Sequence, residues 1–178
     1  PLDSWPDNIP VDTLYSQYQR NAEAGNIDAM RGLGEGLLNG DDSGEWNSFE
    51  RDEVAGEKWL RRSAESGDRI GMRLLGDRLV EGRGVKQDVD AGEVWRTKSV
   101  YAFIKPIIEG IASKGNAQAM LVLGSHMLEP DGIVEQDLVA GRAWLQRAAE
   151  AGETLAMVVL GDRLLDGLGV DQDLVKPL

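Results

Sequence analysis

The segment AGNIDAMRGLGEGLL at residues 24–38 decides the fold, because it returns three more times along the chain. The copies read SGDRIGMRLLGDRLV at 66–80, KGNAQAMLVLGSHML at 114–128 and AGETLAMVVLGDRLL at 151–165. In each copy a Met, a Leu, a Gly and a second apolar residue stand at i, i+3, i+4 and i+7, which is one face of an α-helix. Such recurrence predicts a helical repeat protein.

The glycine inside each copy needs an explanation, since glycine costs a helix about 1 kcal/mol relative to alanine. It recurs at one register as Gly34, Gly76, Gly124 and Gly161. Close approach of a neighbouring helix is the simplest reason to keep it there.

A second helix is expected after each copy. Three of these helices carry an Ala-Gly pair followed three residues later by a tryptophan: Trp59, Trp95 and Trp144. The loop before such a helix reads Gly-x-Gly-Val-x-Gln-Asp at 82–88 and at 167–173, and residues 132–137 match this motif in part. Its glycines suit positive φ, and its Asp suits the N-cap of the second helix. We expect the recurring methionines and tryptophans to be packing residues.

These motifs resemble the Sel-one-like repeat (SLR) family, a relative of the tetratricopeptide repeat. The resemblance covers most of residues 13–175 and implies an all-α fold, a right-handed α/α solenoid of about four SLR helix pairs. We expect a single domain over 1–178, with an N-terminal helix at 11–25. The predicted repeats are 26–66, 68–114, 116–151 and 153–178, the last one truncated. The truncated end would leave an apolar face for a chain extension, a partner or self-association to cover.

Two inserts depart from the pattern. The acidic insert at 40–50 holds Trp46 and Phe49, which either pin the loop or contact a partner, and its acids lack the spacing of an EF-hand. The second insert, at 98–110, contains Pro106, so we expect a helix to break near Lys105. Its apolar residues are expected mostly in the core, with any exposed remainder marking an interface. These residues are Tyr101, Phe103, Ile104, Ile107 and Ile108.

Composition narrows the function. The chain has 178 residues, a net charge of −12 and a pI near 4.5, which argues against nucleic acid and anionic membranes as partners and favours a basic protein partner. No stretch reaches the length of a membrane span, and since no basic segment followed by an apolar one opens the sequence given, we expect no signal peptide within it. Without cysteine, bacterial periplasm and cytoplasm are equally compatible.

The sequence shows no motif that indicates an enzyme. His126 is the single histidine, and adjacent Ser125 points about 100° away on the same helix, so the two cannot form a nucleophile–base pair. One His and no Cys argue against a transition-metal site, and the Gly-rich loops lack the lysine and serine of a phosphate-binding loop. We expect no catalytic residue, metal or cofactor.

By analogy with tetratricopeptide repeats, the first helix of each pair should line a concave groove. The residues that escape the packing face would project there, charged in the first two repeats and largely apolar in the last two. They are Arg31, Glu35, Leu38, Arg73, Asp77, Val80, Leu121, Ser125, Leu128, Val158, Asp162 and Leu165. Such a groove suits an extended peptide or a helix.

The resemblance therefore implies a non-catalytic scaffold or adaptor that binds a protein or peptide in its groove. Two alternatives stay open. One is a bacterial inhibitor or immunity protein that neutralises a toxic effector, for which an acidic surface facing a basic partner would fit. The other is an envelope factor associated with carbohydrate or peptidoglycan.

Overall fold

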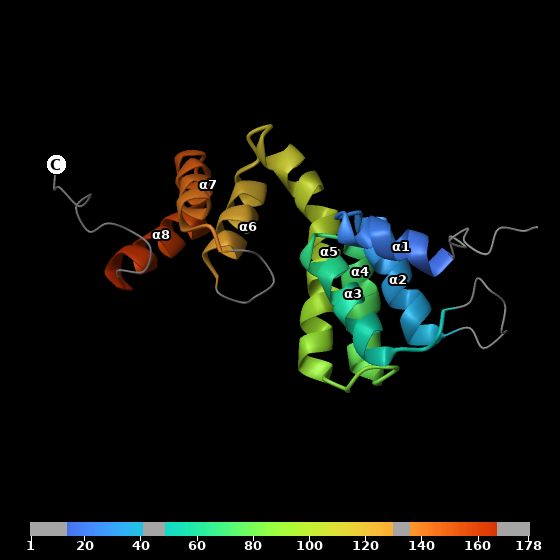
Figure 1. Cartoon of the computed structure of the whole chain (residues 1–178). Coiled ribbons are helices and arrows are strands. Elements are labelled where there is room, and N and C mark those ends of the chain that lie inside the picture. The colour runs from blue at the N-terminus through green and yellow to red at the C-terminus, as the bar shows by residue number, and fades with distance from the viewer. Residues whose placement is uncertain (1–13, 41–48, 130–135, 167–178) are drawn as a thin grey trace, which may run out of the picture. The chain divides into compact units, whose positions relative to one another are not determined.

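The computed structural model describes residues 14–40, 49–129 and 136–166, and every regular element in these ranges is an α-helix (Figure 1). The helices are α1 (Leu14–Glu23), α2 (Ile27–Asn39), α3 (Glu53–Glu65), α4 (Arg69–Glu81), α5 (Val89–Ala112), α6 (Ala117–Leu128), α7 (Leu138–Glu150) and α8 (Thr154–Asp166). Together with the repeated helix pairs of the sequence, they give an all-α fold of the solenoid class, as predicted.

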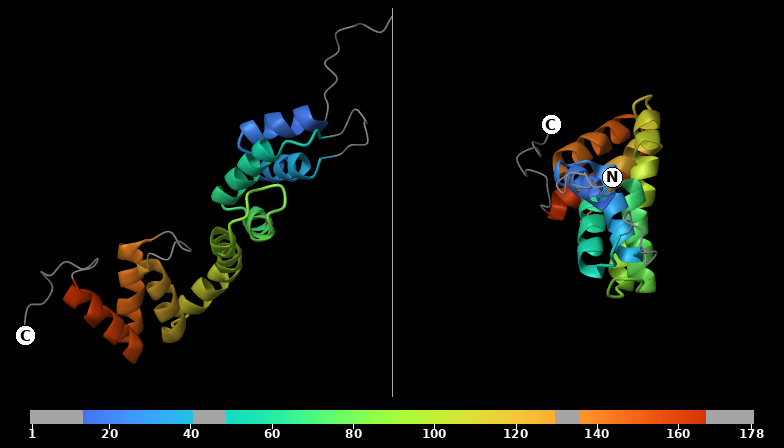
Figure 2. Two further views of the ribbon diagram at one scale, coloured as in Figure 1. Left: turned by 90° about the horizontal axis from the view of Figure 1, so that it is seen from below. Right: turned by 45° about the vertical axis from the view of Figure 1, so that its right-hand side comes forward.

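The chain divides into two compact units, Pro1–Arg96 and Thr97–Leu178, here called unit 1 and unit 2. In unit 1, each of the helices α1 to α4 packs on the next. In unit 2, α6 packs on α7, α7 packs on α8, and α6 also touches α8 (Figure 2). Each unit thus stacks its helices in chain order, as neighbouring repeats do.

The helix ends follow the repeated loops. Asp88 and Asp137 accept hydrogen bonds from the backbone N–H groups of Ala91 and Ala140, at 2.9 Å each, which confirms their predicted N-cap role. Gly67 and Gly152, just past the ends of α3 and α7, have φ near +90°, which explains why glycine recurs there. These caps fix where one helix stops and the next begins.

The recurring helix glycines do sit where two helices approach closely. A methyl group on Gly34 would lie 2.7 Å from the backbone nitrogen of Leu60 in α3. On Gly76 it would lie 2.8 Å from the carbonyl oxygen of Gly92 in α5, and on Gly124 it would lie 2.8 Å from that of Gly141 in α7. The first and second helices of three repeats therefore touch backbone to backbone, and only glycine fits.

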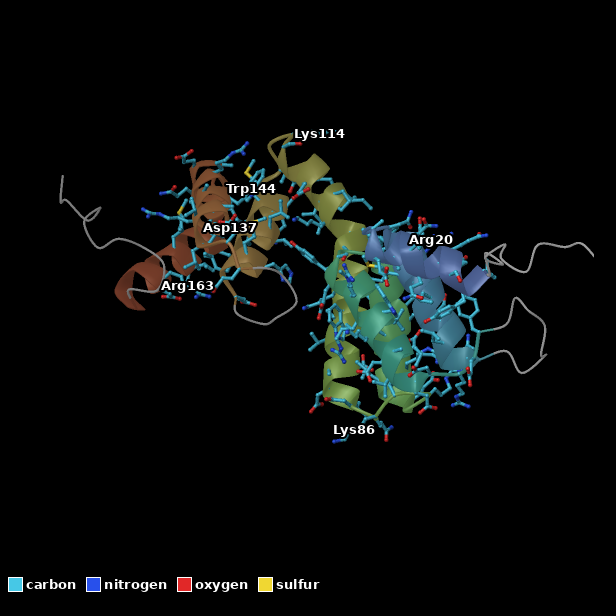
Figure 3. The ribbon with its side chains drawn as sticks, in the orientation of Figure 1. Arg20, Lys86, Lys114, Asp137, Trp144 and Arg163 are labelled. Carbon is cyan, nitrogen blue, oxygen red and sulfur yellow. The ribbon has the colours of Figure 1, made fainter. Side chains whose placement is uncertain are left out.

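The repeat leucines form the cores. Leu33, Leu60 and Leu75 are completely buried in unit 1, and Leu123 and Leu145 are completely buried in unit 2. The tryptophans are half-buried against these cores, and two also stack with an arginine: Arg62 lies 5.2 Å from the ring of Trp59, and Arg147 lies 4.6 Å from that of Trp144. Figure 3 labels Trp144 on α7. Packing is thus the role of these aromatic residues, as predicted.

The predicted helix break near Lys105 is wrong, because α5 runs through Pro106 without interruption. Proline removes one backbone hydrogen bond, and Pro106 lies on an exposed part of the helix. Breaking the helix there would separate the buried Tyr101 from Ile108, which packs on the unit 2 core. Keeping both in place outweighs the single lost hydrogen bond.

The prediction that all four recurring methionines are core residues is wrong for the last one. Met30 and Met120 are buried, whereas Met157 is 49% exposed. A methyl group on Gly161, one turn after Met157, would meet no described atom within 4 Å. Among the described residues, this face of α8 therefore has no helix against it, and Met157 stays exposed for that reason.

Candidate partner-binding surfaces

The predicted groove residues of unit 1 lie within a network of ion pairs. Arg31 on α2 donates to Asp28, 2.5 Å away on its own helix, and to Asp68, 2.6 Å away at the start of α4. The Arg31 side chain is 20% exposed and that of Asp68 is 8% exposed. Arg31 therefore ties two repeats together, which leaves it little freedom to reorient toward a partner.

Asp68 is the most enclosed acid of this network. Burial opposes its ionisation, but hydrogen bonds from the Ser63 hydroxyl, the Arg31 guanidinium and the Ile70 N–H outweigh that cost and lower its pKa. Asp68 is also the N-cap of α4. One carboxylate thus joins α2, α3 and α4.

The second charged group lies on α4 and α5 and is more exposed. Asp77 accepts from Arg96 at 2.7 Å and from Arg73 at a longer 3.4 Å, and Arg96 also donates to Glu93 at 2.9 Å. The Arg73 side chain is 57% exposed. Of the predicted cations in unit 1, Arg73 is the one a partner can reach.

The two apolar residues predicted for the unit 1 groove serve packing. Leu38 is buried and touches Gly56 and Gly84, and Val80 packs on Gly92. Glu35 is half-buried and lines an open polar hollow of about 470 Å³ between α1 and α2. Of the residues predicted for the unit 1 groove, only the polar ones are therefore left for partner contacts.

Unit 2 has Leu121 and Val158 at the repeat position where unit 1 has Arg31 and Arg73. A hollow of about 380 Å³ lies between α6 and α8 and is lined mainly by apolar groups, with Ser125, His126 and Glu129 as its polar members. Its apolar lining consists of Leu121, Val122, Leu155 and Val159.

The predicted residues of unit 2 separate into buried and exposed ones. Leu121 and Leu128 are buried in the core, whereas Val158 is 52% exposed and Asp162 is exposed as well. The side chain of Leu165 lies outside the described residues. Leu128 in particular is out of reach of a partner.

The sequence did not single out Val122, Leu155 and Val159. Leu155 is 58% exposed and stands three residues before Val158 on α8, so the two share a face. We call Val122, Leu155, Val158 and Val159 the unit 2 apolar surface. The sequence did offer a signal for two of them: Leu155 and Val159 are apolar residues of the last repeat that lie outside its Met-Leu-Gly-Leu face.

Of the two aromatic residues of the acidic insert, the structure describes only Phe49. Trp46 lies outside the described residues. Phe49 contacts Tyr15 and Tyr18 edge to face, each at 6.0 Å between ring centroids, and packs against Gly36. Phe49 thus pins the end of the insert to the unit 1 core.

His126 lines the hollow, and its ring lies 5.5 Å from that of Tyr101. In the described part of the chain, no three acidic or histidine side chains are grouped to hold a metal ion. None of the helices described there combines the length and apolar character needed to span a bilayer.

The solved structures to which the chain is similar include two repeat proteins. One is a protective antigen present in uropathogenic Escherichia coli strains, displaying an SLR fold: identity is 26%, coverage is 93% of this chain and 38% of that chain, and the TM-score is 0.43. The other is a Sel1 repeat protein from Oxalobacter formigenes, at 27% identity, covering 82% of this chain and 96% of that chain, with a TM-score of 0.37. The chain thus spans well under half the length of the first protein. A comparison with curated proteins gives no match.

The family model for the Sel1 repeat matches residues 27–68, 70–95, 117–153 and 154–176, which together are more than half of the chain. Each match contains one complete copy of the repeated helix face that begins with Met, and the described helices alternate as the repeat requires. The chain belongs to the Sel1 repeat family.

Proposed function

We propose that this chain is a non-catalytic scaffold or adaptor that binds a protein partner on the unit 2 apolar surface. Sel1 repeat proteins generally act as protein–protein interaction modules. The exposure of Leu155 and Val158 beside the apolar hollow between α6 and α8 carries the proposal.

The chemistry of this surface suits the apolar side chains of a peptide or helix. A hollow of about 380 Å³ accepts one or two such side chains, and burying each contributes about 1.5–3 kcal/mol. Ser125, His126 and Glu129 at its border offer hydrogen bonds that orient the partner. Exposed Arg73 in unit 1 is a candidate for additional polar contacts.

The test is capture of partners from a lysate of the source organism, with quantitative comparison between variants. The double variant Leu155→Asp, Val158→Asp places two charges on the apolar surface and should weaken binding at least tenfold. Both side chains are more than half exposed, so the fold should persist, and far-UV circular dichroism checks this.

The matched control is Val139→Asp on α7. Val139 is 82% exposed and lies outside the proposed surface, so this variant introduces an aspartate into the same unit, one where the double variant introduces two, without touching the site. Partners retained by Val139→Asp and lost by the double variant would support the proposal. Equal retention by both variants would refute it.

The charge of −12 favours a second role, inhibition of a basic effector protein. Electrostatic attraction would then accelerate association, and the association rate constant should fall at least tenfold between about 50 and 500 mM salt. A rate that does not respond to salt would argue for the scaffold role instead.

A further inference from the structure

The polar hollow between α1 and α2 has no role in the function proposed for unit 2. It measures about 470 Å³ and is lined by described residues of these two helices and of the turn that joins them. Both helices belong to unit 1, so the shape of the hollow is set within one compact part of the chain. Its lining is mostly polar, which suits a charged or hydrogen-bonding ligand.

Two helix faces build this hollow. On α1, Tyr18 and Asn21 stand three residues apart, and on α2 Asp28, Gly32 and Glu35 follow a spacing of four and three residues. A methyl group on Gly32 would overlap the Tyr18 ring, so the ring lies directly against the backbone of α2. The hollow thus combines an aromatic ring with carboxylate and amide groups.

The charge of the hollow is negative. Arg31 donates to Asp28 at 2.5 Å and to Asp68 at 2.6 Å, so this cation and its two carboxylates together carry −1. Glu35 adds a second negative charge. Among the described residues, no lysine or arginine nitrogen lies within 4 Å of the Glu35 carboxylate.

Arg78 on α4 is the cation that acts on Glu35 from a longer distance. It attracts Glu35 electrostatically, but its guanidinium donates to the Asn39 side chain at 2.6 Å and to the Arg83 carbonyl at 3.3 Å. With its +1 added to the −2 of the groups above, the sum is still −1. The Glu35 carboxylate is therefore left to pair with a cation from outside the chain.

A guanidinium group fits this set of neighbours. Its parallel N–H groups match the two oxygens of the Glu35 carboxylate, and its planar face stacks on an aromatic ring such as that of Tyr18. The side-chain oxygen of Asn21 can accept from a remaining N–H. A lysine ammonium would keep the charge attraction but lose the paired bonds and the stacking. The charge of −12 on the whole chain attracts such a cationic partner.

We propose that the hollow between α1 and α2 binds an arginine side chain of a partner protein, with Glu35 as the anion that recognises it. This site lies in unit 1 and does not depend on the unit 2 apolar surface, so that either site can fail without the other.

The probe is the tripeptide Gly-Arg-Gly with both ends capped, titrated into the isotope-labelled full chain and followed by two-dimensional amide NMR spectra. The amide signals of Gly32 and Glu35 should shift and saturate, with a Kd in the millimolar range because a single side chain is bound. Shifts that saturate only outside the hollow would place the arginine elsewhere and remove this site. This readout needs no variant.

Glu35→Gln keeps the size of the side chain and removes its charge, so binding should weaken by about fivefold or more. The amide spectrum of the variant itself checks that it folds. The matched control is Glu65→Gln: Glu65 is an exposed acid of α3 in unit 1 and lies outside the hollow. This control makes the same change in net charge and should bind as the unmodified chain does. Equal losses in both variants would mean that overall charge alone attracts the peptide, which would overturn the proposal.

Two further peptides decide the chemistry of the ligand. Citrulline in place of arginine keeps the shape without the charge and should give no saturable shift; binding as tight as that of arginine would refute recognition by Glu35. Lysine in place of arginine should bind about threefold or more weakly. Equal binding of the lysine peptide would overturn the preference for a guanidinium.

Discussion

Units 1 and 2 use one repeat register to present opposite chemistry. The residue that follows the repeat methionine is Arg31 or Arg73 in unit 1, and Leu121 or Val158 in unit 2. In unit 1, Arg31 pairs with Asp68 at the start of α4, whereas Arg73 pairs with Asp77 on its own helix. In unit 2, Leu121 lines an apolar hollow and Val158 is 52% exposed.

The difference shows that scaffold and surface are encoded by separate positions of one repeat. Gly34, Gly76 and Gly124 fix the distance between helices in both units, whatever stands next to them. The neighbouring positions can therefore change from arginine to leucine without changing how the helices stack. This separation is what allows a repeat fold to acquire different partners.

The largest effect should come from the shared glycines. Gly76→Ala places a methyl group 2.8 Å from the carbonyl oxygen of Gly92, and both backbones are held by their own helices. We expect a loss of about 2–3 kcal/mol in the free energy of unfolding, because overpacking against backbone cannot relax cheaply. Urea unfolding followed by circular dichroism measures it.

Gly161→Ala is the matched control, with the same substitution at the same register. No described atom lies within 4 Å of the added methyl group, so the helix propensity of alanine should stabilise α8 by up to about 1 kcal/mol. A destabilisation as large as that of Gly76→Ala would show that another helix packs on this face of α8 as well.

A smaller effect should follow from removing the charge that joins the helices of unit 1. Asp68→Asn keeps an N-cap residue, as Asn26 and Asn116 show, but loses the ion pair with Arg31. We expect a loss of about 1 kcal/mol near neutral pH, since the pair is largely enclosed.

The same substitution has a defined pH dependence. Because folding lowers the pKa of Asp68, its contribution is present above the ordinary aspartate pKa and is lost as the pH falls through the lowered value. Urea unfolding at a series of acidic pH values should therefore show the two proteins converging. Asp137→Asn is the control: Asp137 is exposed and caps α7, and substituting it should change stability by less than about 0.5 kcal/mol. A constant difference between Asp68→Asn and the unmodified chain at all pH values would contradict the assignment.

Much of the fold could be predicted from the sequence, because the determining signals are local and repeated. Helix glycines, loop glycines and N-cap aspartates each act over a few residues, and repetition makes them recognisable. The error at Pro106 has the opposite cause: the local rule predicts a break, while the contacts of Tyr101 and Ile108 hold the helix together. The prediction that Met157 is buried was wrong because a methionine at this repeat position is covered only when another helix packs on that face.

The candidate site was harder to predict, because exposure depends on which neighbour covers a side chain. Leu38, Leu121 and Leu128 belong to the same predicted groove-facing set as exposed Val158, yet all three are buried. Register alone cannot separate these cases, since the covering residues come from other helices. Leu155 was missed for the same reason.

The smallest effect is expected at Arg73, and comparison with Arg31 distinguishes a charge that stabilises unit 1 from one that does not. Arg73→Ala removes an exposed partner 3.4 Å from Asp77, which keeps Arg96 at 2.7 Å, so stability should change by less than about 0.5 kcal/mol. Arg31→Ala leaves the enclosed Asp68 without its cation and should cost about 1 kcal/mol. Parallel urea titrations of the two variants measure the difference. Equal losses would mean that the unit 1 arginines all serve stability, and Arg73 would then no longer be a candidate for partner contact.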